Sequence, residues 1–264
     1  MTLREDPLPD GTHSSAEHHA ADSAPAHSFY ADLFGWEVRA LPSEASGHLM
    51  ADQDGHVVAG IGVRPKPELP LVWSTYLSVD DADATVAKIT AAGGRLLVAP
   101  VDVPHRGRMA FAADPTGAGF GIWQDRSRHG ADRDEEHGPT CWNECHTRDY
   151  LVAQSFYADV FGWSFDEIGD GSYGYSIAKR AGDGEGVGGI HQLGDEIPEG
   201  IDAYWLAWFS VGDCDAVVKR AVELGASVRL PPMDSPFGRM AGLAGPHGEI
   251  FGVIDAQMVT PVPV

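Results

Sequence analysis

The sequence repeats itself. The nonapeptide SFYADLFGW at residues 28–36 returns as SFYADVFGW at residues 155–163 with a single substitution. A second match, GRMA at residues 107–110 and again at 238–241, follows in the same order. The copies are offset by 127 residues at the first match and by 131 at the second, so the spacing inside each copy is kept. A repeat with conserved order and spacing predicts two tandem copies of one domain.

At 264 residues, the chain is long enough for two domains that each bury a core. Its 43% hydrophobic and 22% charged residues are typical of globular proteins. Residues 126–137 carry charges of both signs and almost no apolar side chain, which predicts a solvated linker. We therefore predict a flexible tail over residues 1–10, a first domain over 11–125, this linker, and a second domain over 138–257.

The formal net charge is -21, which disfavours nucleic acid and anionic membrane surfaces as partners because both would repel the chain. Three cysteines, at positions 141, 145 and 214, are too few for a disulfide framework and suit a reducing compartment. No apolar run follows the first charges, and no stretch approaches membrane-spanning length. These features predict a cytoplasmic protein, and the duplication leaves both a monomer and a homodimer open.

Capping signals predict four helices. Asp22 or Ser23 starts a segment that ends at Gly35, and Asp149 caps one that ends at Gly162. Shorter helices are predicted from near Asp80 or Asp81 to a stop at residues 93–94, and from near Asp213 to a stop at Gly225. Strands are predicted at residues 71–79, 109–113, 119–124, 204–211, 240–243 and 249–255. Each copy therefore reads βαβββ twice, an α+β fold with mixed sheets.

These elements carry recognisable motifs. They are FY at residues 29–30, FGW at 34–36, SVDD at 78–81 and DPTG at 114–117. The pattern resembles the vicinal oxygen chelate superfamily, which includes glyoxalases, bleomycin-resistance proteins and extradiol dioxygenases. The resemblance implies two tandem glyoxalase-like domains, each made of paired βαβββ modules that form a cup-shaped mixed sheet. It does not fix the chemistry, because members include metal-dependent enzymes and metal-free drug-binding proteins.

In the metal-using members, ligands occupy the first and last strands of each module. The equivalent positions here are Ser15, about Ala59, Ser74 and Gly121 in the first domain, and Trp142, about Gly188, Leu206 and Gly252 in the second. None of these residues is His, Glu, Asp or Cys, and divalent ions need imidazole, carboxylate or thiolate donors. We therefore predict no metal and no other cofactor.

Strand alternation predicts what lines the cups instead, because side chains at i and i+2 share a face. The first cup is expected to contain His13, Ser15, Glu17, His19, Val72, Ser74, Tyr76, Gly121 and Trp123. The second is expected to contain Thr140, Trp142, Glu144, His146, Tyr204, Leu206, Trp208, Gly252 and Ile254. Such an aromatic lining suits a flat small molecule. The predicted ligand contacts are Trp142, Tyr204, Trp208, Ser74, Tyr76 and Trp123.

Each domain places a glutamate two residues before a histidine on this face, Glu17 with His19 and Glu144 with His146. A carboxylate and an imidazole in an apolar cleft can exchange a proton with a bound phenol or enol, so these four residues are the catalytic candidates. Glu144 is the preferred acid/base, with His146 as its partner. The alternative is that each glutamate only hydrogen-bonds the protein around it.

Two arginines follow a glycine at a strand entrance, Arg108 and Arg239. A guanidinium there could clamp an anionic ligand, and the more frequent use of such a residue is a surface ion pair.

The segment at residues 13–19, HSSAEHH, has poor β propensity. It is either a frayed strand or a relocated metal site that uses His13, Glu17 and His19. A zinc site at Cys141 and Cys145 is disfavoured. Four residues along an extended strand span about 13 Å, which is too far for one tetrahedral ion.

We expect a metal-independent protein that binds an aromatic or polyketide-like molecule and assists its tailoring by acid/base chemistry, such as cyclisation, isomerisation, dehydration or help to a hydroxylation. A non-catalytic drug-binding or resistance protein is the first alternative. A metal-dependent lyase or dioxygenase is the second.

Overall fold

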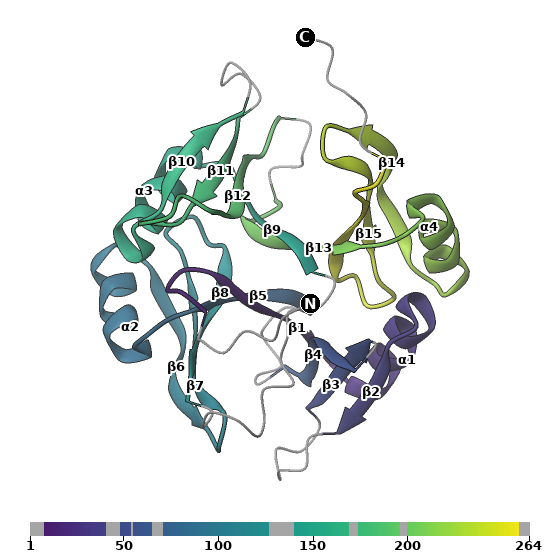
Figure 1. Ribbon diagram of the computed structural model, residues 1–264, viewed down its shortest axis with the longest axis horizontal. Helices are drawn as coiled ribbons and strands as arrows, with labels where there is room; N and C mark the ends of the chain where they lie inside the picture. The colour runs from purple at the N-terminus through teal and green to yellow at the C-terminus, as the bar shows by residue number, and fades with distance from the viewer. Residues whose placement is uncertain are drawn as a thin grey trace. The chain divides into compact units, whose positions relative to one another are not determined.

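The computed structural model describes residues 8–40, 48–53, 55–64, 71–126, 140–168, 174–195 and 200–258. Of the predicted linker, all but Arg126 lies outside these residues, as do residues 1–7 of the predicted tail. The described chain consists of four successive βαβββ modules, drawn in Figure 1, so each copy of the sequence repeat contains two modules.

The first module runs through β1 (His13–Ala20), α1 (Ser23–Phe34), β2 (Glu37–Ala40), β3 (Leu49–Gln53) and β4 (His56–Val63). The second runs through β5 (Val72–Ser78), α2 (Ala82–Ala91), β6 (Arg95–Val103), β7 (Gly107–Ala113) and β8 (Gly119–Asp125). The third runs through β9 (Thr140–Thr147), α3 (Tyr150–Phe161), β10 (Ser164–Glu167), β11 (Tyr175–Lys179) and β12 (Gly186–Gln192). The fourth runs through β13 (Tyr204–Ser210), α4 (Cys214–Glu223), β14 (Ser227–Ser235), β15 (Gly238–Ala244) and β16 (Ile250–Asp255).

The strands form two open sheets of eight. Their orders are β2-β3-β4-β1-β5-β8-β7-β6 and β10-β11-β12-β9-β13-β16-β15-β14. Within a module the last three strands pair antiparallel, and the first pairs parallel with the last. The two sheets repeat one topology, which confirms the predicted α+β class with two tandem copies of one mixed-sheet domain.

The helix starts follow the capping signals in two cases. Asp81 and Asp213 are N-caps whose carboxylates accept hydrogen bonds from backbone N–H groups three residues on, at 3.0 and 2.9 Å. Asp149 is the N-cap of α3, as predicted, but its side chain makes no cap hydrogen bond. The Thr147 hydroxyl instead accepts a hydrogen bond from the Asp149 backbone N–H at 3.1 Å.

The segment with poor β propensity is a regular strand. β1 pairs in parallel with β4, from Glu17 opposite Gly60 to Ala20 opposite Val63. Burial alternates along it, so Ala16 and His18 enter the core while Glu17 and His19 face the other way. Pairing and a buried face therefore override the local preference of the sequence.

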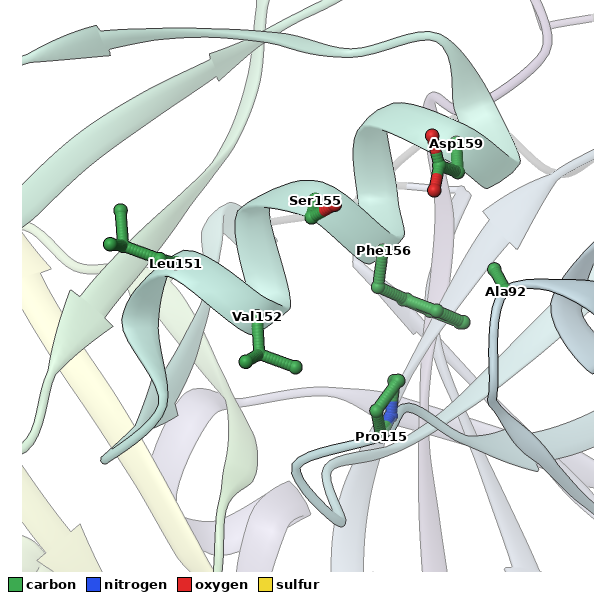
Figure 2. Close-up of a pocket in the computed structure, with 7 residues that line it drawn as sticks. All are labelled: Ala92, Pro115, Leu151, Val152, Ser155, Phe156 and Asp159. Atoms are coloured by element: carbon green, nitrogen blue, oxygen red, sulfur yellow. The ribbon is translucent and has the colours of Figure 1, made fainter.

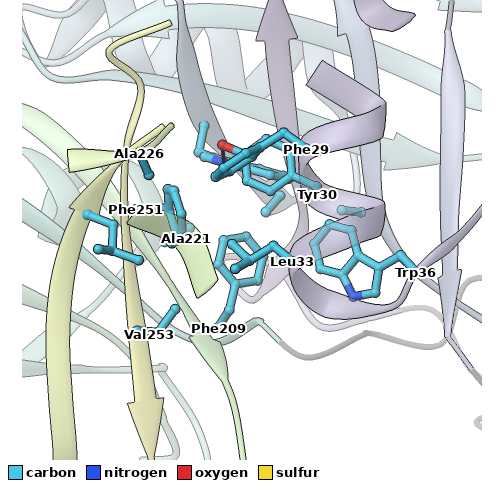
Figure 3. Packing of buried hydrophobic residues seen from close by; sticks show 14 of the residues in the cluster. Phe29, Tyr30, Leu33, Trp36, Phe209, Ala221, Ala226, Phe251 and Val253 are labelled. Atoms are coloured by element: carbon cyan, nitrogen blue, oxygen red, sulfur yellow. Dashed lines mark hydrogen bonds between the residues drawn. The ribbon is translucent and has the colours of Figure 1, made fainter. Parts of the chain in front are cut away.

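The chain divides into two compact units, and neither is one copy of the repeat. One unit consists mainly of the second and third modules and also contains residues 204–206 of β13. The other consists mainly of the first and fourth modules and also contains Val72 and Trp73 of β5. Each unit has its own aromatic core. Figure 3 shows the core of the second unit, where Phe29, Tyr30 and Trp36 from the α1 region pack with Phe209 and Phe251 of β13 and β16.

Each core contains one tyrosine that links a tryptophan to a buried carboxylate. In the unit of modules two and three, the Trp205 indole donates to the Tyr157 hydroxyl at 2.8 Å, which donates to Asp114 at 3.0 Å. Burial, followed by the charge of Asp114, raises the pKa of Tyr157 well above its ordinary value. These bonds satisfy polar groups that would otherwise be costly to bury.

In the described part of the chain, every helix is too short or too polar to cross a membrane.

Candidate active site

The first strand of the third module, β9, sorts its side chains onto two faces. Cys145 belongs to the hydrophobic core of the unit, and Asn143 and Thr147 share its face. Trp142, Glu144 and His146 alternate with them and so point to the opposite face. The Cys145 thiol has a pKa well above its ordinary value because it is buried, with Asp114 as the next cause, so it is a core residue rather than a nucleophile.

Glu144 and His146 are in direct contact. The Nε2 atom of His146 lies 2.9 Å from Oε1 of Glu144. Their side chains are only 9% and 11% exposed, in the order Glu144, His146, so little water screens the pair. Two residues apart on a strand, they reach each other because both project from the same face. The structure therefore brings together the preferred acid/base and its predicted partner.

Tyr204 of β13 covers the imidazole of His146. The two rings are parallel, with centroids 4.9 Å apart and an interplanar angle of 2°. Burial, and then the negative charge of Glu144, raise the pKa of Tyr204, so its phenol stays protonated at neutral pH. The stack fixes the plane of the imidazole, and with it the directions in which the two ring nitrogens point.

A second histidine, which the sequence reasoning missed, completes the cluster. His191 of β12 lies directly opposite His146 in the parallel pairing of β9 with β12. The Nδ1 atoms of the two rings are 3.2 Å apart, which is hydrogen-bonding distance. The pairing of β12 with β9 would have identified His191, because the register that places Gly189 opposite Glu144 also places His191 opposite His146. That register could not be read from the sequence of one strand.

Two aromatic side chains form a wall beside this cluster. The Trp142 indole donates a hydrogen bond to the Tyr175 hydroxyl at 2.8 Å. That hydroxyl lies over Gly189, where a Cβ atom would stand only 2.4 Å from it. The ring of Tyr175 also packs against His191, with centroids 5.8 Å apart. Gly189 is therefore required for the close approach of the tyrosine to the strand that faces Glu144.

The copy of this site in the first module is assembled differently. Glu17 faces His48, with Oε1 to Nε2 at 3.8 Å, and their side chains are 24% and 28% exposed in that order. His48 lies over Gly60 and Gly62, where added Cβ atoms would come within 3.1 and 2.8 Å of its ring. Burial is the main cause that lowers the pKa of His19, and Glu17 partly opposes it. The sequence reasoning missed His48 as well.

The other predicted ligand contacts lie on β5, β8 and β13. Tyr76 is buried, and its ring occupies the space over Gly121, 2.3 Å from where a Cβ would be. Trp208 is buried over Gly252 in the same way, at 2.1 Å. The last two predicted ligand contacts are Trp123 and Ser74. Trp123 of β8 is half-buried, and the Ser74 hydroxyl is buried without a hydrogen-bond partner among the described residues. Contact of these four side chains with a ligand stays a prediction.

Both predicted arginine clamps are engaged in ion pairs. Arg108 donates to both carboxylate oxygens of Asp83, at 2.9 and 3.0 Å, and to Asp102 at 2.9 Å. Arg239 is held in the same way, by Asp215 and one further carboxylate. The hydrogen bonds from each guanidinium are the main cause that lowers the pKa of Asp83 and of Asp215. An anionic ligand would have to displace a carboxylate at either place.

The residues at the family's metal positions do not fit a metal ion. Gly121 and Gly252 offer no donor, and the aromatic rings over them fill the space that a longer side chain would need. Trp142 and Leu206 at two further positions have no atom suited to a divalent ion. Across the ranges that the structure describes, no three His, Cys, Asp or Glu side chains gather into a group that could hold one.

The surface of the unit of modules two and three also has a shallow pocket of about 340 Å³. Figure 2 shows its lining, in which Leu151, Val152 and Asp159 of α3 lie on one side and Pro115 and Ala92 on the other. None of the candidate site residues lines it. The Glu144 cluster and this pocket are therefore separate features of the unit.

Paired βαβββ modules in two open sheets define the structural class of this protein. Comparison with known families shows which superfamily that class is. A family model described as "Glyoxalase/Bleomycin resistance protein/Dioxygenase superfamily" matches residues 18–122 and 146–253, once for each copy of the repeat. The chain belongs to this superfamily.

Relatives of similar length are known. One relative is CFP32 of Mycobacterium tuberculosis, which is named as a glyoxylase. It is 37% identical over 252 residues, which cover 92% of this chain and 94% of that protein. The anthracycline biosynthesis protein DauV of Streptomyces sp. (strain C5) is 34% identical over 91% of both chains. The anthracycline biosynthesis protein DnrV of Streptomyces peucetius is also 34% identical, over 89% of this chain and 90% of that protein.

Among solved structures, the Mn(II)-bound glyoxalase from Novosphingobium aromaticivorans matches with a TM-score of 0.62 at 18% identity, covering 96% of this chain and 88% of that one. The 2,2',3-trihydroxybiphenyl 1,2-dioxygenase from Sphingomonas wittichii matches with a TM-score of 0.61 at 15% identity, covering 95% and 91%. At these identities the likeness shows the fold alone.

Proposed function

We propose that this protein binds a flat aromatic or polyketide-like small molecule on the face of β9 and β12 and assists its tailoring by acid/base chemistry at Glu144 and His146, without a metal. The observation that carries the proposal is the contact between these two side chains at 2.9 Å, in a place where both are about nine-tenths buried. A proton that arrives at this pair is held by an imidazole beside a carboxylate, with little competition from water.

The aromatic side chains around the pair support the ligand class. Trp142 and Tyr175 are joined by a hydrogen bond that orients both rings, and Tyr204 lies flat on His146. Rings held rigidly in this way offer stacking surface at little entropic cost. Two relatives with about a third of their residues identical are named as anthracycline biosynthesis proteins, and this supports a polyketide as the molecule.

Acid/base chemistry is the reaction type that these residues can supply. Cyclisation, isomerisation and dehydration of a polyphenolic ketone each need a proton removed next to a carbonyl and a proton returned elsewhere. Glu144 and His146 differ in charge and can hold that proton between the two steps. The donor-poor residues at the family's metal positions support a reaction that uses no metal.

A non-catalytic binding protein is the second candidate, and one observation favours it. Glu144 and His146 satisfy each other by hydrogen bonding, which is what buried polar groups do when they have only a structural role. The aromatic wall would bind a drug or carry a product without any help from the pair.

The two candidates separate in one experiment. α-Tetralone is a bicyclic aryl ketone with exchangeable hydrogens next to its carbonyl, and proton NMR in heavy water follows their replacement by deuterium. We expect the protein to accelerate this exchange and Glu144→Ala to lower the accelerated rate by about 10²-fold or more, in the range typical of a lost acid/base group. Binding of the flat dye alizarin should stay within about tenfold in the same variant.

Unchanged exchange in Glu144→Ala would contradict the acid/base role. Tight binding of alizarin with no exchange above buffer in the native protein would favour the binding protein. Elemental analysis of protein purified without an affinity tag checks the metal, because a stoichiometric transition metal would contradict the metal-free proposal.

A further inference from the structure

We propose that Glu144, His146 and His191 form a proton relay in which His191, not Glu144, is the base that takes the proton from the ligand. The inference rests on the proposed function, because it names the residue that performs the proton transfer at the same site.

The strand register places the three groups in a line. Glu144 and His146 are two residues apart on one face of β9, and His191 is the direct neighbour of His146 on β12. The line runs from Oε1 of Glu144 to Nε2 of His146 at 2.9 Å, and from Nδ1 of His146 to Nδ1 of His191 at 3.2 Å. Both nitrogens of the central imidazole are therefore in hydrogen-bonding contact.

The line also fixes which nitrogens carry protons. An ionised carboxylate only accepts, so Nε2 of His146 must donate to Glu144. When His146 is neutral, its Nδ1 then has the lone pair and must accept from Nδ1 of His191. Neutral His191 is thereby left with its lone pair on Nε2. The buried carboxylate of Glu144 thus determines, through His146, that the basic nitrogen of His191 is Nε2.

The proton transfer balances without any further reactant. A phenol or enol of the ligand gives its proton to Nε2 of His191 and becomes an anion. His191 passes the proton on its Nδ1 to Nδ1 of His146. His146 is then an imidazolium next to the Glu144 carboxylate, and His191 is neutral again with its proton on Nε2. Reversal of the same steps returns the proton to the product.

Two groups contact the imidazole of His146, where the transferred proton arrives. Glu144 supplies an opposite charge in a nearly dry place, where a charge-assisted hydrogen bond is strong. The ring centroid of Tyr204 lies 4.9 Å from that of the imidazole, within the range of cation–π attraction. Two further titratable groups lie beside the relay. They are Tyr175 of β11, whose ring packs on His191, and the Cys145 thiol, which the charge of Glu144 reaches.

The tautomers test the relay without any turnover. Histidine labelled with the heavy nitrogen isotope reports by NMR whether each ring nitrogen carries a proton, and His146→Gln and His191→Gln spectra assign the two residues among the twelve histidines of the chain. We expect the proton of neutral His146 on Nε2 and the proton of neutral His191 on Nδ1. The opposite tautomer at either residue would overturn the relay.

A second measurement tests whether His191 is the accepting base. Alizarin changes colour when its phenol ionises, so absorbance gives the pH at which the bound dye loses its proton. In the native protein we expect bound alizarin to lose its phenol proton at lower pH than the free dye. The proton concentration at its midpoint should be at least about tenfold higher. Glutamine keeps an N–H for His146 but cannot take up a proton, so in His191→Gln this shift should be lost.

His247→Gln is the matched control, because His247 is an exposed histidine on the turn after β15. It should leave the dye titration as in the native protein. A full shift in His191→Gln would overturn the relay even if Glu144→Ala abolishes exchange, and the proposed acid/base function would then stand without it. If alizarin fails to bind, the proposed function loses its ligand class while the tautomers still decide the relay.

Discussion

The two copies of the repeat have the same glutamate and histidine but give them different partners. In the second copy Glu144 contacts His146 at 2.9 Å in a nearly dry place, and His191 extends the line. In the first copy Glu17 faces His48 at 3.8 Å, and both side chains are about a quarter exposed. The position of His191 is taken in the first copy by a glycine, Gly62, and the ring of His48 from another segment lies over that glycine instead. Shared residues therefore do not make two equal sites.

The buried cores of the two units show the reverse, in which different residues make equal contacts. In the unit of modules one and four, the Trp73 indole donates to the Tyr30 hydroxyl at 2.8 Å, which donates to Glu249 at 2.9 Å. This is the arrangement that Asp114 completes in the other unit, but Glu249 stands four residues further along its turn. Gly245 occupies the place equivalent to Asp114. A Cβ on Gly245 would lie 2.1 Å from the Glu249 carboxylate, so the glycine makes room for the displaced acid.

The largest effect is expected where the two sites are compared directly. Glu144→Gln should lower the rate of deuterium exchange into α-tetralone by about 10³-fold, because the imidazolium of His146 loses its buried counter-charge. Glu17→Gln should lower it by less than about threefold, because the contact of Glu17 with His48 is longer and more exposed. Parallel rate measurements on the two variants make the comparison. Equal losses would mean that both copies work as acid/base sites.

The contrast between the two faces explains how much the sequence could predict. The repeat, the helix caps and the strand alternation were sufficient for the four modules, for the faces of β1 and β9, and for the meeting of Glu144 with His146. These depend on local periodicity, which a single segment carries. His191 and His48 were missed because they join their sites through the pairing of strands that lie more than 25 residues apart in the chain.

A swap of carboxylates between turn positions tests the equivalence of the buried networks. Glu249→Ala should reduce the free energy of unfolding by about 3 kcal/mol, because it leaves the Tyr30 hydroxyl buried without its acceptor. Gly245→Asp alone should cost a similar amount, about 3 kcal/mol, through overpacking and two adjacent carboxylates. The double variant reproduces the Asp114 arrangement and should cost less than either change alone. Denaturant unfolding of the four proteins gives the coupling energy, and additive losses would contradict the equivalence.

The networks should also differ in their response to acid. The position of Cys145 in one unit is occupied by His18 in the other, where burial, followed by the charges of His19 and His247, lowers the pKa of His18 from 6.5 to about 3. The unfolded state therefore binds a proton that the folded state does not. Stability is fully present above pH 6.5 and falls as the pH drops from there toward about 3.

Over two pH units below 6.5, His18 alone should remove about 2.7 kcal/mol from the free energy of unfolding. His18→Cys copies the residue of the other unit, whose thiol does not ionise in this range, so it should flatten that part of the profile. Stability curves of the two proteins against pH measure the difference in slope. A slope that is unchanged in His18→Cys would show that His18 is not the group responsible.

The smallest effect concerns the glycines under the two sites. A methyl group at Gly189 would stand 2.4 Å from the Tyr175 hydroxyl and 2.8 Å from the ring carbon that bears it, so the rigid ring has to swing away and lose its bond to Trp142. At Gly60 the nearest atoms, at 3.0 and 3.1 Å, belong to Glu17 and His48, which can turn aside because both are about a quarter exposed. Gly189→Ala should therefore weaken alizarin binding by about tenfold, or about 1.4 kcal/mol. Gly60→Ala should change it by less than about twofold. Absorbance titrations of both variants measure the affinities, and an equal response would place the dye somewhere other than against the Trp142 and Tyr175 wall.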